Sequence, residues 1–525
     1  MIKIQKIKLV NFKRFSVFQL EFDDRLNILV GDNESGKSSI LTALDIVLSG
    51  SRTKIETLGL DSLFNIEAIN SFLKSGKEYV KLPILSVELY LNEQNNLKLN
   101  GKDNSDGKGC DGLQLICEPN DLLSKEIKDI LQQKEPNFPF EYYTISFRTF
   151  SGESYTGYSN FVKHLLLDNS QINAEYATRE YVKTLYSSNV IDSEKNRHQN
   201  EYRKAKDNFK NEILIDLNKR VDKYSFTIRS NSKSNLENDL TIAENDINIE
   251  NKGKGRQCFI KTDFALTKKT KNKDIDILLI EEPENHLSHI NMKKLINRII
   301  ESVKNEEKQL FITTHNDLIS SRLDLRKTIL LNSNSSTSLK LTGLKEKTAE
   351  FFIKAPNNRI LELILSKKVI LVEGDAEFIL LESFFENHTQ KLLSDSDVHI
   401  ISVGGTSFKR FLDISTILNI KTVVIRDNDS DFQTYCIDRY SDYNDNPQIN
   451  ICFDKDNTRR TFEISLYEEN KELVESLFGP KRKGLSIQDY MLKNKTEAAL
   501  ELLIQTQQNI SIPDYIKEAI EWIIN

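Results

Sequence analysis

Two groups of residues in this 525-residue chain have types and spacings that suit phosphate chemistry. The first is GDNESGKS, from Gly31 to Ser38, which lies between an apolar run and a helical pattern. In such a GxxxxGK[ST] segment, backbone N–H groups face the phosphates of a nucleotide, the lysine adds a positive charge and the hydroxyl holds Mg²⁺. The segment therefore predicts a nucleotide site, against the alternative of a glycine-rich turn. Its candidate binding residues are Gly31, Asn33, Gly36, Lys37, Ser38 and Ser39.

Two further strand ends supply the remaining groups of a nucleotide hydrolase. The run ILLI leads into Glu281 and Glu282, and the run LFITT leads into His315. We expect Glu281 to bind the hydration shell of Mg²⁺ and Glu282 to orient and deprotonate the attacking water. His315 is placed to sense the γ-phosphate. The alternatives are two exposed glutamates after a buried strand, and a structural histidine.

The second group is a set of carboxylates that follow two other strands, in the segments VILVEGDAE and VVIRDNDSD. Carboxylates at period-two spacing on an extended segment project to one side, and their crowding raises their pKa values unless a cation is present. Oxygen ligands without His or Cys favour Mg²⁺ or Mn²⁺, and two such ions would bracket the attacking and leaving oxygens of a phosphodiester. The alternative is a solvated acidic rim. The candidate metal ligands are Glu373, Asp375, Glu377, Asp427, Asp429 and Asp431.

Alternating strands and helices must position both groups. Residues 2–30 predict two strands, and a helix should follow from Lys37. Strands that alternate with helices twice along the chain predict two α/β domains. The further predicted strands are residues 83–91, 142–150, 274–280, 309–315, 367–375, 398–403 and 421–427, with a polar loop between the first two.

A polar, helical segment over roughly residues 160–225 interrupts this alternation. It is either a solvated arm or a partner-binding helical insertion. We favour the insertion because several apolar side chains in it need a surface to pack against. These are Leu165, Leu166, Leu167, Ile213, Leu214 and Leu217.

The composition excludes several classes of protein. Lys+Arg 72 against Asp+Glu 78 gives a net charge of -6, which excludes a uniformly basic nucleic-acid binder but leaves room for a local basic groove. Five scattered cysteines without a CxxC pair argue against a disulfide framework or a zinc site. The first residues lack the apolar core of a signal peptide, and no apolar run reaches the length of a membrane span. We therefore expect a cytoplasmic protein with no membrane partner.

In their order and residue types, the nucleotide motifs resemble those of the ABC-type ATPase heads of the SMC/RecF/OLD group. NFKRF (11–15) is similar to their N-terminal basic-aromatic motif, and EEPENHLS is similar to their Walker B motif and D-loop. NKGKGRQ resembles a degenerate signature motif with Gly253, Gly255 and Gln257 at the matching positions, which implies that one subunit completes the ATP site of another. Glu281 stands where the group usually has aspartate, and we find no clean Q-loop glutamine. Both departures favour slow or regulated hydrolysis.

The carboxylate group resembles a TOPRIM domain, with a glutamate after the first strand, a turn at Gly404-Gly405 and a DxD pair. An ATPase head with a helical insertion and a C-terminal TOPRIM domain resembles the OLD (overcoming lysogenization defect) family of ATP-powered nucleases. That family includes anti-phage effectors of Gabija and retron type. The resemblance adds Glu463 as a metal ligand and Lys495 as the cation that stabilises the pentavalent phosphate, against a surface charge in each case. The catalytic residues that it implies are Glu373, Glu377, Asp427, Asp429, Lys495 and Glu282, and the metal ligands include Ser38 and Glu463.

The resemblance implies an α/β chain in which residues 1–160 and 226–350 form the ATPase head, 161–225 a helical dimerisation insertion and 365–525 the TOPRIM domain. It implies an ATP-gated DNA endonuclease that uses ATP and Mg²⁺ (or Mn²⁺), acts as a homodimer or larger oligomer and serves anti-phage defence. The expected accessory partner is a reverse transcriptase with its RNA–DNA hybrid, or a helicase-like protein. Arg426 and Lys409 are basic residues near the acidic cluster that could contact a phosphate backbone.

Three alternative functions stay open at this point. A topoisomerase or primase shares the TOPRIM domain, but a topoisomerase needs a tyrosine nucleophile on a separate DNA-gate domain, for which we see no room after the TOPRIM unit. An SMC/RecF-like DNA-binding or repair ATPase would have little nuclease activity. A TOPRIM nuclease acting on RNA would use the same chemistry.

Overall fold

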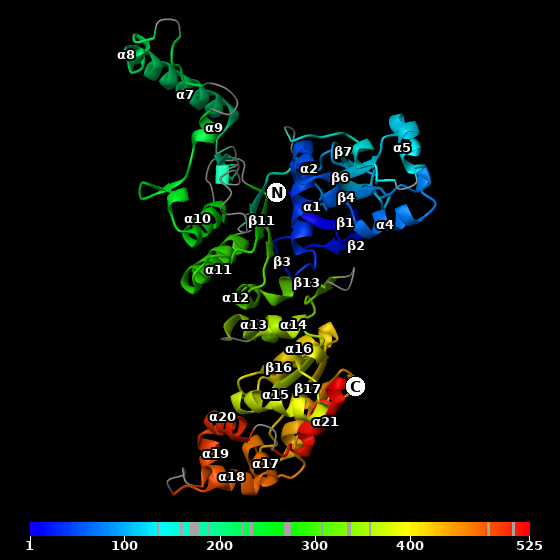
Figure 1. The fold of residues 1–525 in the computed structure, drawn as a ribbon, viewed down its shortest axis with the longest axis vertical. Helices are drawn as coiled ribbons and strands as arrows, with labels where there is room; N and C mark the ends of the chain where they lie inside the picture. The colour runs from blue at the N-terminus through cyan, green and yellow to red at the C-terminus, as the bar shows by residue number, and fades with distance from the viewer. Residues whose placement is uncertain are drawn as a thin grey trace. The chain divides into compact units, whose positions relative to one another are not determined.

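The chain forms two compact units, each with its own sheet structure (Figure 1). Unit 1 comprises Met1–His315 and Leu331–Ser338, and unit 2 comprises Asn316–Leu330 and Leu339–Asn525. This computed structural model describes residues 1–133, 136–157, 161–168, 178–179, 181–183, 185–186, 190–221, 224–229, 235–266, 275–305, 308–332, 338–355, 359–479, 484–506 and 510–525. No helix in these described ranges combines the length and apolar character that a membrane span needs.

An antiparallel sheet forms one layer of unit 1, with strand order β2-β1-β4-β6-β5 and β7 paired to β6. Buried and exposed residues alternate along its β2 strand, as is typical of a sheet with one covered face. Its strands are β1 (Ile4–Phe12), β2 (Phe15–Glu21), β4 (Leu85–Leu91), β5 (Asn100–Gly101), β6 (Cys110–Pro119) and β7 (Tyr143–Thr149).

A parallel run of strands, in the order β3-β12-β11-β8, forms the centre of unit 1. Every residue of β3 and β12 is buried, because helices cover parallel strands on both faces. Helix α1 packs against all four strands. Because parallel strands end at one edge, the residues that follow them meet there. The bounds are β3 (Leu26–Gly31), β8 (His164–Asp168), β11 (Ile277–Glu281), β12 (Gln309–Thr313), α1 (Lys37–Ser49), α10 (Lys254–Leu266) and α11 (His289–Lys304).

Unit 2 contains a second parallel sheet, with strand order β16-β15-β17-β18. Helices α15 and α20 pack against each other, and α21 packs against β15, β17 and β18. Residues of all three helices belong to one hydrophobic core with the sheet. The bounds are β15 (Lys368–Val372), β16 (Val398–Ser402), β17 (Lys421–Ile425), β18 (Ile449–Cys452), α15 (Asp375–Thr389), α16 (Phe408–Leu418), α17 (Phe462–Glu469), α18 (Lys471–Phe478), α19 (Ile487–Lys493), α20 (Lys495–Thr506) and α21 (Asp514–Ile524).

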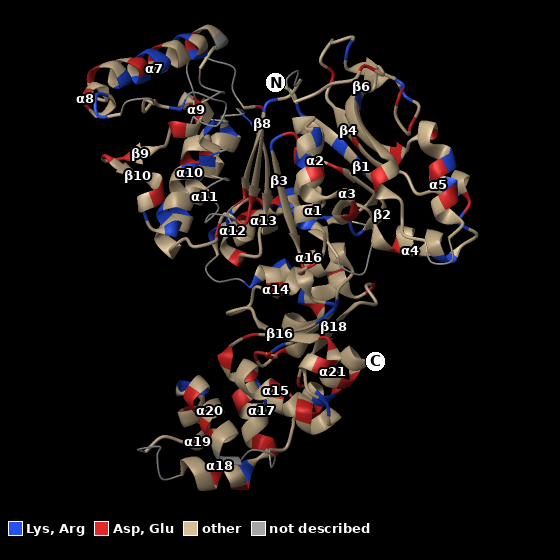
Figure 2. Ribbon diagram, turned by 45° about the horizontal axis from the view of Figure 1, so that its top comes forward, with Lys and Arg blue, Asp and Glu red and all other residues tan. Residues whose placement is uncertain are grey.

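Shorter elements complete both units. In unit 1, α7 is highly polar, and Figure 2 shows basic and acidic segments alternating along it. The chain passes between the units after His315, after Leu330 in β13 and after Ser338 in β14. The bounds are α2 (Arg52–Leu58), α3 (Leu60–Leu63), α4 (Ile66–Lys74), α5 (Ser124–Leu131), α7 (Asp192–Glu212), α8 (Ile215–Asn218), α9 (Leu236–Asp239), β9 (Ala243–Glu244), β10 (Ile247–Asn248), α12 (Asp317–Arg322), β13 (Thr328–Leu331), β14 (Ser338–Lys340), α13 (Glu346–Lys354) and α14 (Ile360–Leu365).

The predicted α/β fold class is confirmed, and so are the helix from Lys37 and the strands that carry the motifs. Both strands predicted within residues 2–30 are present, as β1 and β3, but a third strand between them, β2, pairs with β1 in a hairpin and was not predicted. The polar loop after residue 91 is shorter than expected, since its two ends form β5 and the start of β6.

The prediction of a helical segment from residue 160 is wrong at its start. Leu165, Leu166 and Leu167 belong to β8, a strand that pairs with β11. A short apolar run cannot be assigned to strand or helix by periodicity alone, and its partner here lies more than a hundred residues away. Ile213 and Leu217 are exposed near α8. Residues 160, 169–177, 180, 184, 187–189 and 222–223 of that segment, and residue 274 of the predicted strand 274–280, lie outside the described residues.

Candidate functional site

Two glycines let the loop between β3 and α1 pack closely against neighbouring segments. Gly36 has a φ of +96°, and a Cβ at this position would lie 2.5 Å from the ring of Phe15. A Cβ at Gly31 would lie 2.2 Å from the carbonyl oxygen of Leu331. Arg14 donates to the carbonyl oxygen of Glu34 within the loop. The basic-aromatic segment NFKRF therefore supports the loop from one side. Asn33 and Ser38 are exposed, and Ser39 is half-buried.

Lys37 is buried, and neutral acceptors hold its ammonium group. Its Nζ donates to the carbonyl oxygens of Gly31 at 2.7 Å and Asp32 at 2.8 Å, and to Ser35 Oγ at 3.3 Å. Burial lowers the pKa of Lys37 to about 8, although the nearby Glu282 opposes the shift. An anion in the loop would replace these neutral acceptors and favour the charged lysine.

Glu281 ends β11 and faces the first turn of α1. Burial raises the pKa of Glu281, a hydrogen bond with Ser38 opposes this rise, and repulsion from Asp168 adds to it. Asp168 ends β8 directly opposite Glu281 in the parallel register. The strand ends therefore bring Glu281 to the hydroxyl of Ser38, as a shared Mg²⁺ site requires.

Glu282, Glu284 and His315 form a second group at the same edge. Asn285 Nδ2 donates to Glu282 Oε2 at 2.8 Å, and His315 Nε2 lies 3.7 Å from Glu282 Oε1. Burial and the charge of Lys37 lower the pKa of His315. Glu284 Oε1 accepts from the backbone N–H of His315 at 2.8 Å and from the Thr314 hydroxyl at 2.7 Å. Glu284 thus fixes the end of β12 that presents His315.

Gly253 and Gly255 flank the start of α10, and their surroundings differ. A Cβ at Gly255 would lie 2.1 Å from the carbonyl oxygen of His286, whereas Gly253 has open space around it. Gly255 therefore lets α10 approach the loop that carries Glu281 and Glu282. Gln257 Nε2 donates to the carbonyl oxygen of Lys252 at 2.8 Å within the same turn.

In unit 2, the predicted carboxylates lie at the ends of β15 and β17. Glu373 directly follows β15, and its carbonyl oxygen accepts from the N–H of Gly405 at 2.9 Å. Gly405 has a φ of +113°, which a residue with a side chain rarely adopts. Glu377 lies in the first turn of α15, with its side chain folded back toward Gly374. The glycine turn therefore holds the backbone beside Glu373.

Backbone clamps after β17 bring Glu463 to the same place. Asp427 Oδ1 accepts from the N–H of Phe462 at 2.8 Å, which fixes the N-terminus of α17. The buried Asn428 side chain donates at 2.9 Å to the carbonyl oxygens of Asp454 and Asp456. Glu463 follows in the first turn of α17. Chain segments about 35 residues apart are therefore joined at the DxD sequence.

The unit 2 carboxylates repel one another inside the protein. Burial raises the pKa of Glu377 to about 7, and the charges of Glu463 and Glu373 add to the rise. Burial also raises the pKa of Asp427 well above its usual range, with repulsion from Glu377 and Glu373. Lys495 Nζ lies 2.9 Å from Glu463 Oε1. Glu463 Oε2 is buried without a hydrogen-bond partner in the described part of the chain.

Asp375 and Asp431 are placed differently from the rest of the predicted set. Asp375 is exposed in the first turn of α15. Asp431 is exposed and accepts from the hydroxyl of Thr434 at 2.7 Å. The period-two argument assumed an extended backbone through residue 431, but β17 ends at Ile425 and Asp429 has a φ of +48°. Lys409 pairs with Asp442 at 3.5 Å.

Comparison with known proteins agrees with the two sites. Residues 2–319 match the AAA ATPase domain family, and residues 364–429 match the TOPRIM domain of overcoming lysogenization defect protein-like chains. The chain is also 22% identical to the endonuclease GajA of Bacillus cereus (strain HuB5-5), over 90% of this chain and 82% of GajA. The protein belongs to the OLD family of nucleases.

Two other relatives match parts of this OLD-family chain. The DNA replication and repair protein RecF of Clostridioides difficile (strain 630) is 23% identical over 67% of this chain and 94% of RecF. The C-terminal region of the Burkholderia pseudomallei OLD protein covers 30% of this chain and 97% of its own, with 19% identity and a TM-score of 0.23. Unit 1 thus contains the ATPase domain, and unit 2 contains the TOPRIM domain.

The donor set of the TOPRIM domain suits a divalent ion. Glu377 and Asp427 have raised pKa values, and Glu463 has an unsatisfied buried oxygen, so a cation would relieve both costs. Across the described ranges, no three acidic, histidine or cysteine side chains already converge to hold an ion. Metal binding would therefore have to draw these side chains together.

Several residues of the OLD-family sites escaped the sequence analysis. Glu284 lies within the EEPEN motif, but only the structure shows that it holds Thr314 and His315. Asp168 carries no local signal, because it depends on the pairing of β8 with β11. Asn428 lies between two predicted ligands. In the sequence it stands out as an uncharged polar residue inside an acidic segment.

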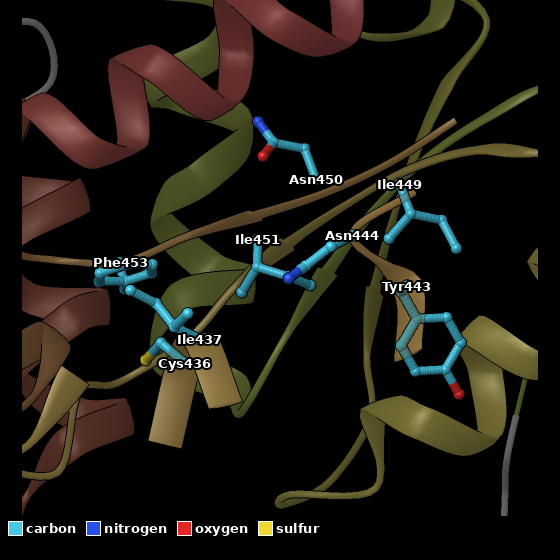
Figure 3. A pocket seen from close by; sticks show the side chains of 8 residues that line it. All are labelled: Cys436, Ile437, Tyr443, Asn444, Ile449, Asn450, Ile451 and Phe453. Carbon is cyan, nitrogen blue, oxygen red and sulfur yellow. The ribbon is translucent and has the colours of Figure 1, made fainter. Parts of the chain in front are cut away.

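A pocket of about 220 Å³ adjoins the TOPRIM sheet beside β18, and its lining includes Cys436, Tyr443, Asn450 and Phe453 (Figure 3). Its described lining has no charged side chain. Cys436 Sγ donates to the carbonyl oxygen of Asp427 at 3.5 Å, so the pocket lies behind the carboxylate cluster. The described lining of the pocket therefore offers no charged side chain to a metal or a phosphate.

Proposed function

We propose that this OLD-family nuclease is an ATP-gated, divalent-metal-dependent DNA endonuclease. The observation that carries the proposal is the cluster of the buried Glu377 and Glu463 and the half-buried Asp427, whose carboxylates carry raised pKa values or an unsatisfied oxygen. Such a cluster is costly unless a cation neutralises it. Oxygen ligands alone favour Mg²⁺ or Mn²⁺.

In this proposal, Glu377, Asp427 and Glu463 hold the divalent ion. The ion would supply Lewis-acid stabilisation of a phosphodiester and a more acidic bound water. Lys495 stands 2.9 Å from Glu463 and is half-exposed, so its ammonium group can reach a phosphate that enters from solvent. Its role is to stabilise the charge that develops on the phosphorane oxygens.

The ATPase domain would control access to this chemistry. Lys37 and the loop from Gly31 bind the phosphates of ATP, while Ser38 and Glu281 hold its Mg²⁺. Glu282 orients the attacking water, and His315 senses the γ-phosphate from a position set by Glu284. Gly253 and Gly255 would complete the ATP site of a second copy, so nucleotide binding and dimerisation would be coupled.

A second copy of the chain and DNA are the proposed partners. Helix α7 presents charges of both signs, and Phe209 and Ile213 are exposed near its C-terminal end, which supports contact with a partner helix. We further propose a role in anti-phage defence, with an accessory protein that supplies the trigger. The similarity to GajA supports the nuclease, and the accessory protein would be a reverse transcriptase with its hybrid or a helicase-like protein.

The proposed activity is tested with supercoiled plasmid, Mg²⁺ or Mn²⁺, and ATP present or absent. We expect metal-dependent nicking or linearisation by the wild-type chain and its loss in Glu377→Gln. Glu382→Gln is the matched control, because Glu382 is an exposed glutamate on the same helix, α15. A rate that is unchanged by ATP would contradict gating.

A parallel reaction with a structured RNA substrate separates the two polymers. Cleavage of RNA alone, abolished by Glu377→Gln, would replace DNA with RNA as the substrate. Cleavage of plasmid that persists in Glu377→Gln would contradict the assignment of the TOPRIM cluster.

A further inference from the structure

The pocket beside β18, at the edge of the TOPRIM sheet, has a lining that suits a flat and neutral ligand. Figure 3 shows two aromatic rings on opposite sides of it, Phe453 on one side and Tyr443 on the other, with Ile451 and Asn444 between them. Pockets for drug-sized ligands have about 300–1,000 Å³. A pocket of about 220 Å³ therefore suits a smaller ligand, of the size of one heterocyclic ring system.

Both aromatic rings are held by residues that do not line the pocket. The Tyr443 hydroxyl donates to the carbonyl oxygen of Lys409 at 3.1 Å and to Asp413 Oδ1 at 3.0 Å. The Phe453 ring stacks on Phe432, with 5.5 Å between the ring centroids and 19° between the ring planes. Rings that are already fixed lose little conformational entropy when a flat group stacks on them. The walls of the pocket are therefore preorganised for stacking.

The side-chain amide of Asn444 supplies a polar group that a ligand can use. Asn444 is exposed, its side chain points toward Ile451 in Figure 3, and its amide has no hydrogen-bond partner among the described residues. By contrast, Asn450 Nδ2 donates to Cys452 Sγ at 3.5 Å. A carboxamide both donates and accepts, and so does the edge of a nucleobase. Stacking surfaces combined with such a group are the means by which proteins bind unpaired bases.

Two contacts connect the pocket to the DxD sequence. Cys436, which lines the pocket, donates from Sγ to the carbonyl oxygen of Asp427 at 3.5 Å. Phe432, which stacks on Phe453, directly follows Asp431. The wall of the pocket is thus attached to the loop that carries the Asp427 carboxylate. A strand whose phosphate reaches the carboxylates can therefore place a neighbouring base in the pocket.

Two cations without an acidic partner follow the lining residues in the sequence. Arg439 and Lys455 are exposed, each lies two residues after a lining residue, and neither forms an ion pair among the described residues. The exposed Asp431 and Asp456, in contrast, each accept from the hydroxyl of a nearby threonine at 2.7 Å. Arg439 and Lys455 are therefore available to phosphates, which the uncharged lining itself cannot bind.

We propose that this pocket binds one unpaired base of the DNA strand that the TOPRIM domain cleaves. The base stacks against the rings of the lining and pairs with Asn444, while the phosphates of the strand contact Arg439 and Lys455. The inference rests on the proposed nuclease function and names its substrate class, which is DNA with an unpaired nucleotide beside the scissile phosphate. A free nucleotide fits less well, because the described lining holds no cation for its phosphate.

A photocrosslink locates the base directly. The full-length Asp427→Asn chain, which keeps the backbone carbonyl bonded to Cys436, is mixed with Mg²⁺, ATP and a DNA duplex that has one unpaired 5-iodouracil. Irradiation joins this base to an aromatic side chain stacked on it, and mass spectrometry identifies the residue. We expect Tyr443 or Phe453. A crosslink to neither ring would overturn the inference. So would an equal yield from free 5-iodo-deoxyuridine monophosphate, which would mark a site for free nucleotides.

Cleavage by the wild-type chain tests the inference by selectivity. We expect kcat/KM for a duplex with one unpaired base to exceed that for the fully paired duplex by about tenfold or more. Phe453→Leu removes a stacking ring and should lower this ratio by about fivefold or more. If Phe453→Leu fails to fold, Asn444→Ala at an exposed position gives the same test. Ser441→Ala is the control, because Ser441 is exposed nearby and does not line the pocket.

The inference and the nuclease function fail in different ways. Equal kcat/KM for the paired and unpaired duplexes would overturn the inference and leave the nuclease function intact. A ratio that both pocket variants leave unchanged would also overturn it, because another surface would then select the unpaired base. Cleavage of neither duplex would overturn both.

Discussion

The two sites of the chain follow one plan but hold their positive charge in opposite ways. In both, acidic residues lie at the ends of neighbouring parallel strands and meet at one edge of a sheet. In the ATPase domain, Lys37 is held by two carbonyl oxygens and a hydroxyl, which are neutral acceptors. In the TOPRIM domain, Arg426 is held by two carboxylates.

This difference shows what each site can exchange. A phosphate can replace the neutral acceptors of Lys37 and gain a charge–charge interaction in doing so. Nothing comparable can replace the carboxylates of Arg426 without a large cost. The ATPase domain therefore holds its cation with groups that a phosphate can replace, whereas the TOPRIM domain holds Arg426 as part of the structure.

The largest expected effect is a loss of ATP hydrolysis that leaves metal binding by the TOPRIM domain unchanged. Glu282→Gln removes the group that we propose orients and deprotonates the attacking water, so ATP hydrolysis should fall by about 10²- to 10⁴-fold. Mn²⁺ binding by the TOPRIM domain in the absence of nucleotide should not change. Steady-state phosphate release measures the first quantity, and Glu301→Gln on the exposed face of α11 is the control. Hydrolysis at the wild-type rate would assign the base elsewhere.

A smaller effect tests whether Glu284 positions the ATPase site. Glu284→Gln weakens the bonds to Thr314 and His315, and a hydrogen bond to a charged group is worth about 1.5–3 kcal/mol. ATP hydrolysis should therefore fall by about tenfold or more, while ATP affinity changes little. A loss of affinity with an unchanged turnover rate would mean that Glu284 supports the loop and not the reaction.

A third change tests the clamp behind the TOPRIM carboxylates. Asn428→Ala removes the donors to the Asp454 and Asp456 carbonyl oxygens, and the free energy of unfolding should fall by about 2 kcal/mol. Metal affinity should fall with it, because the loop that leads to Glu463 loses its anchor. Urea denaturation measures the first quantity. Unchanged stability would show that the loop is held by its other contacts.

The two sites should also respond to pH in opposite directions. The proton on Glu377, whose pKa is about 7, must leave before a cation binds, so Mn²⁺ affinity should rise with pH up to about 7. Lys37, whose pKa is about 8, loses its charge above that pH, so ATP affinity should fall there. Calorimetric titrations at pH 6, 7, 8 and 9 measure both. Mn²⁺ and ATP affinities that change in the same direction with pH would contradict this prediction.

The same shift affects folding stability. Because the pKa of Glu377 lies above its ordinary 4.5, its contribution to stability is complete below pH 4.5 and is lost as the pH rises through about 7. The metal-free chain should therefore become less stable over this interval, by comparison with Glu377→Gln, which lacks the titration. Thermal unfolding of both chains checks this, and an identical pH dependence would contradict it.

Local spacing was enough to predict the parts of both sites that follow strands directly. The loop from Gly31 to Ser38, and Glu281, Glu373 and Asp427, each lie where an apolar run ends, and parallel strands end together. The placement of Asp431 could not be predicted in this way. It depends on backbone angles at Asp429 and Ser430 that the residue types do not fix.

Other features depend on contacts between distant segments. The apolar run of β8 forms a strand by pairing with β11, which lies more than a hundred residues away in the sequence. Arg426 was recognised as a basic residue near the acids, but its burial and its two ion pairs arise from the packing of β15 against β17. The sequence pattern does not distinguish a solvated arginine from a buried one, and the three-dimensional structure shows that Arg426 is buried and paired.

We propose that one chain carries two separate phosphate-cleaving sites, with DNA cleavage in the TOPRIM domain. The most direct test of this proposal measures plasmid cleavage and ATP hydrolysis in the same reactions for the wild-type chain, Asp427→Asn and Glu282→Gln. We predict that Asp427→Asn loses cleavage by more than about 100-fold and keeps its ATPase activity, because the substitution removes a charged ligand of the proposed divalent ion. Glu282→Gln should lose ATP hydrolysis. Wild-type cleavage by Asp427→Asn would contradict the account.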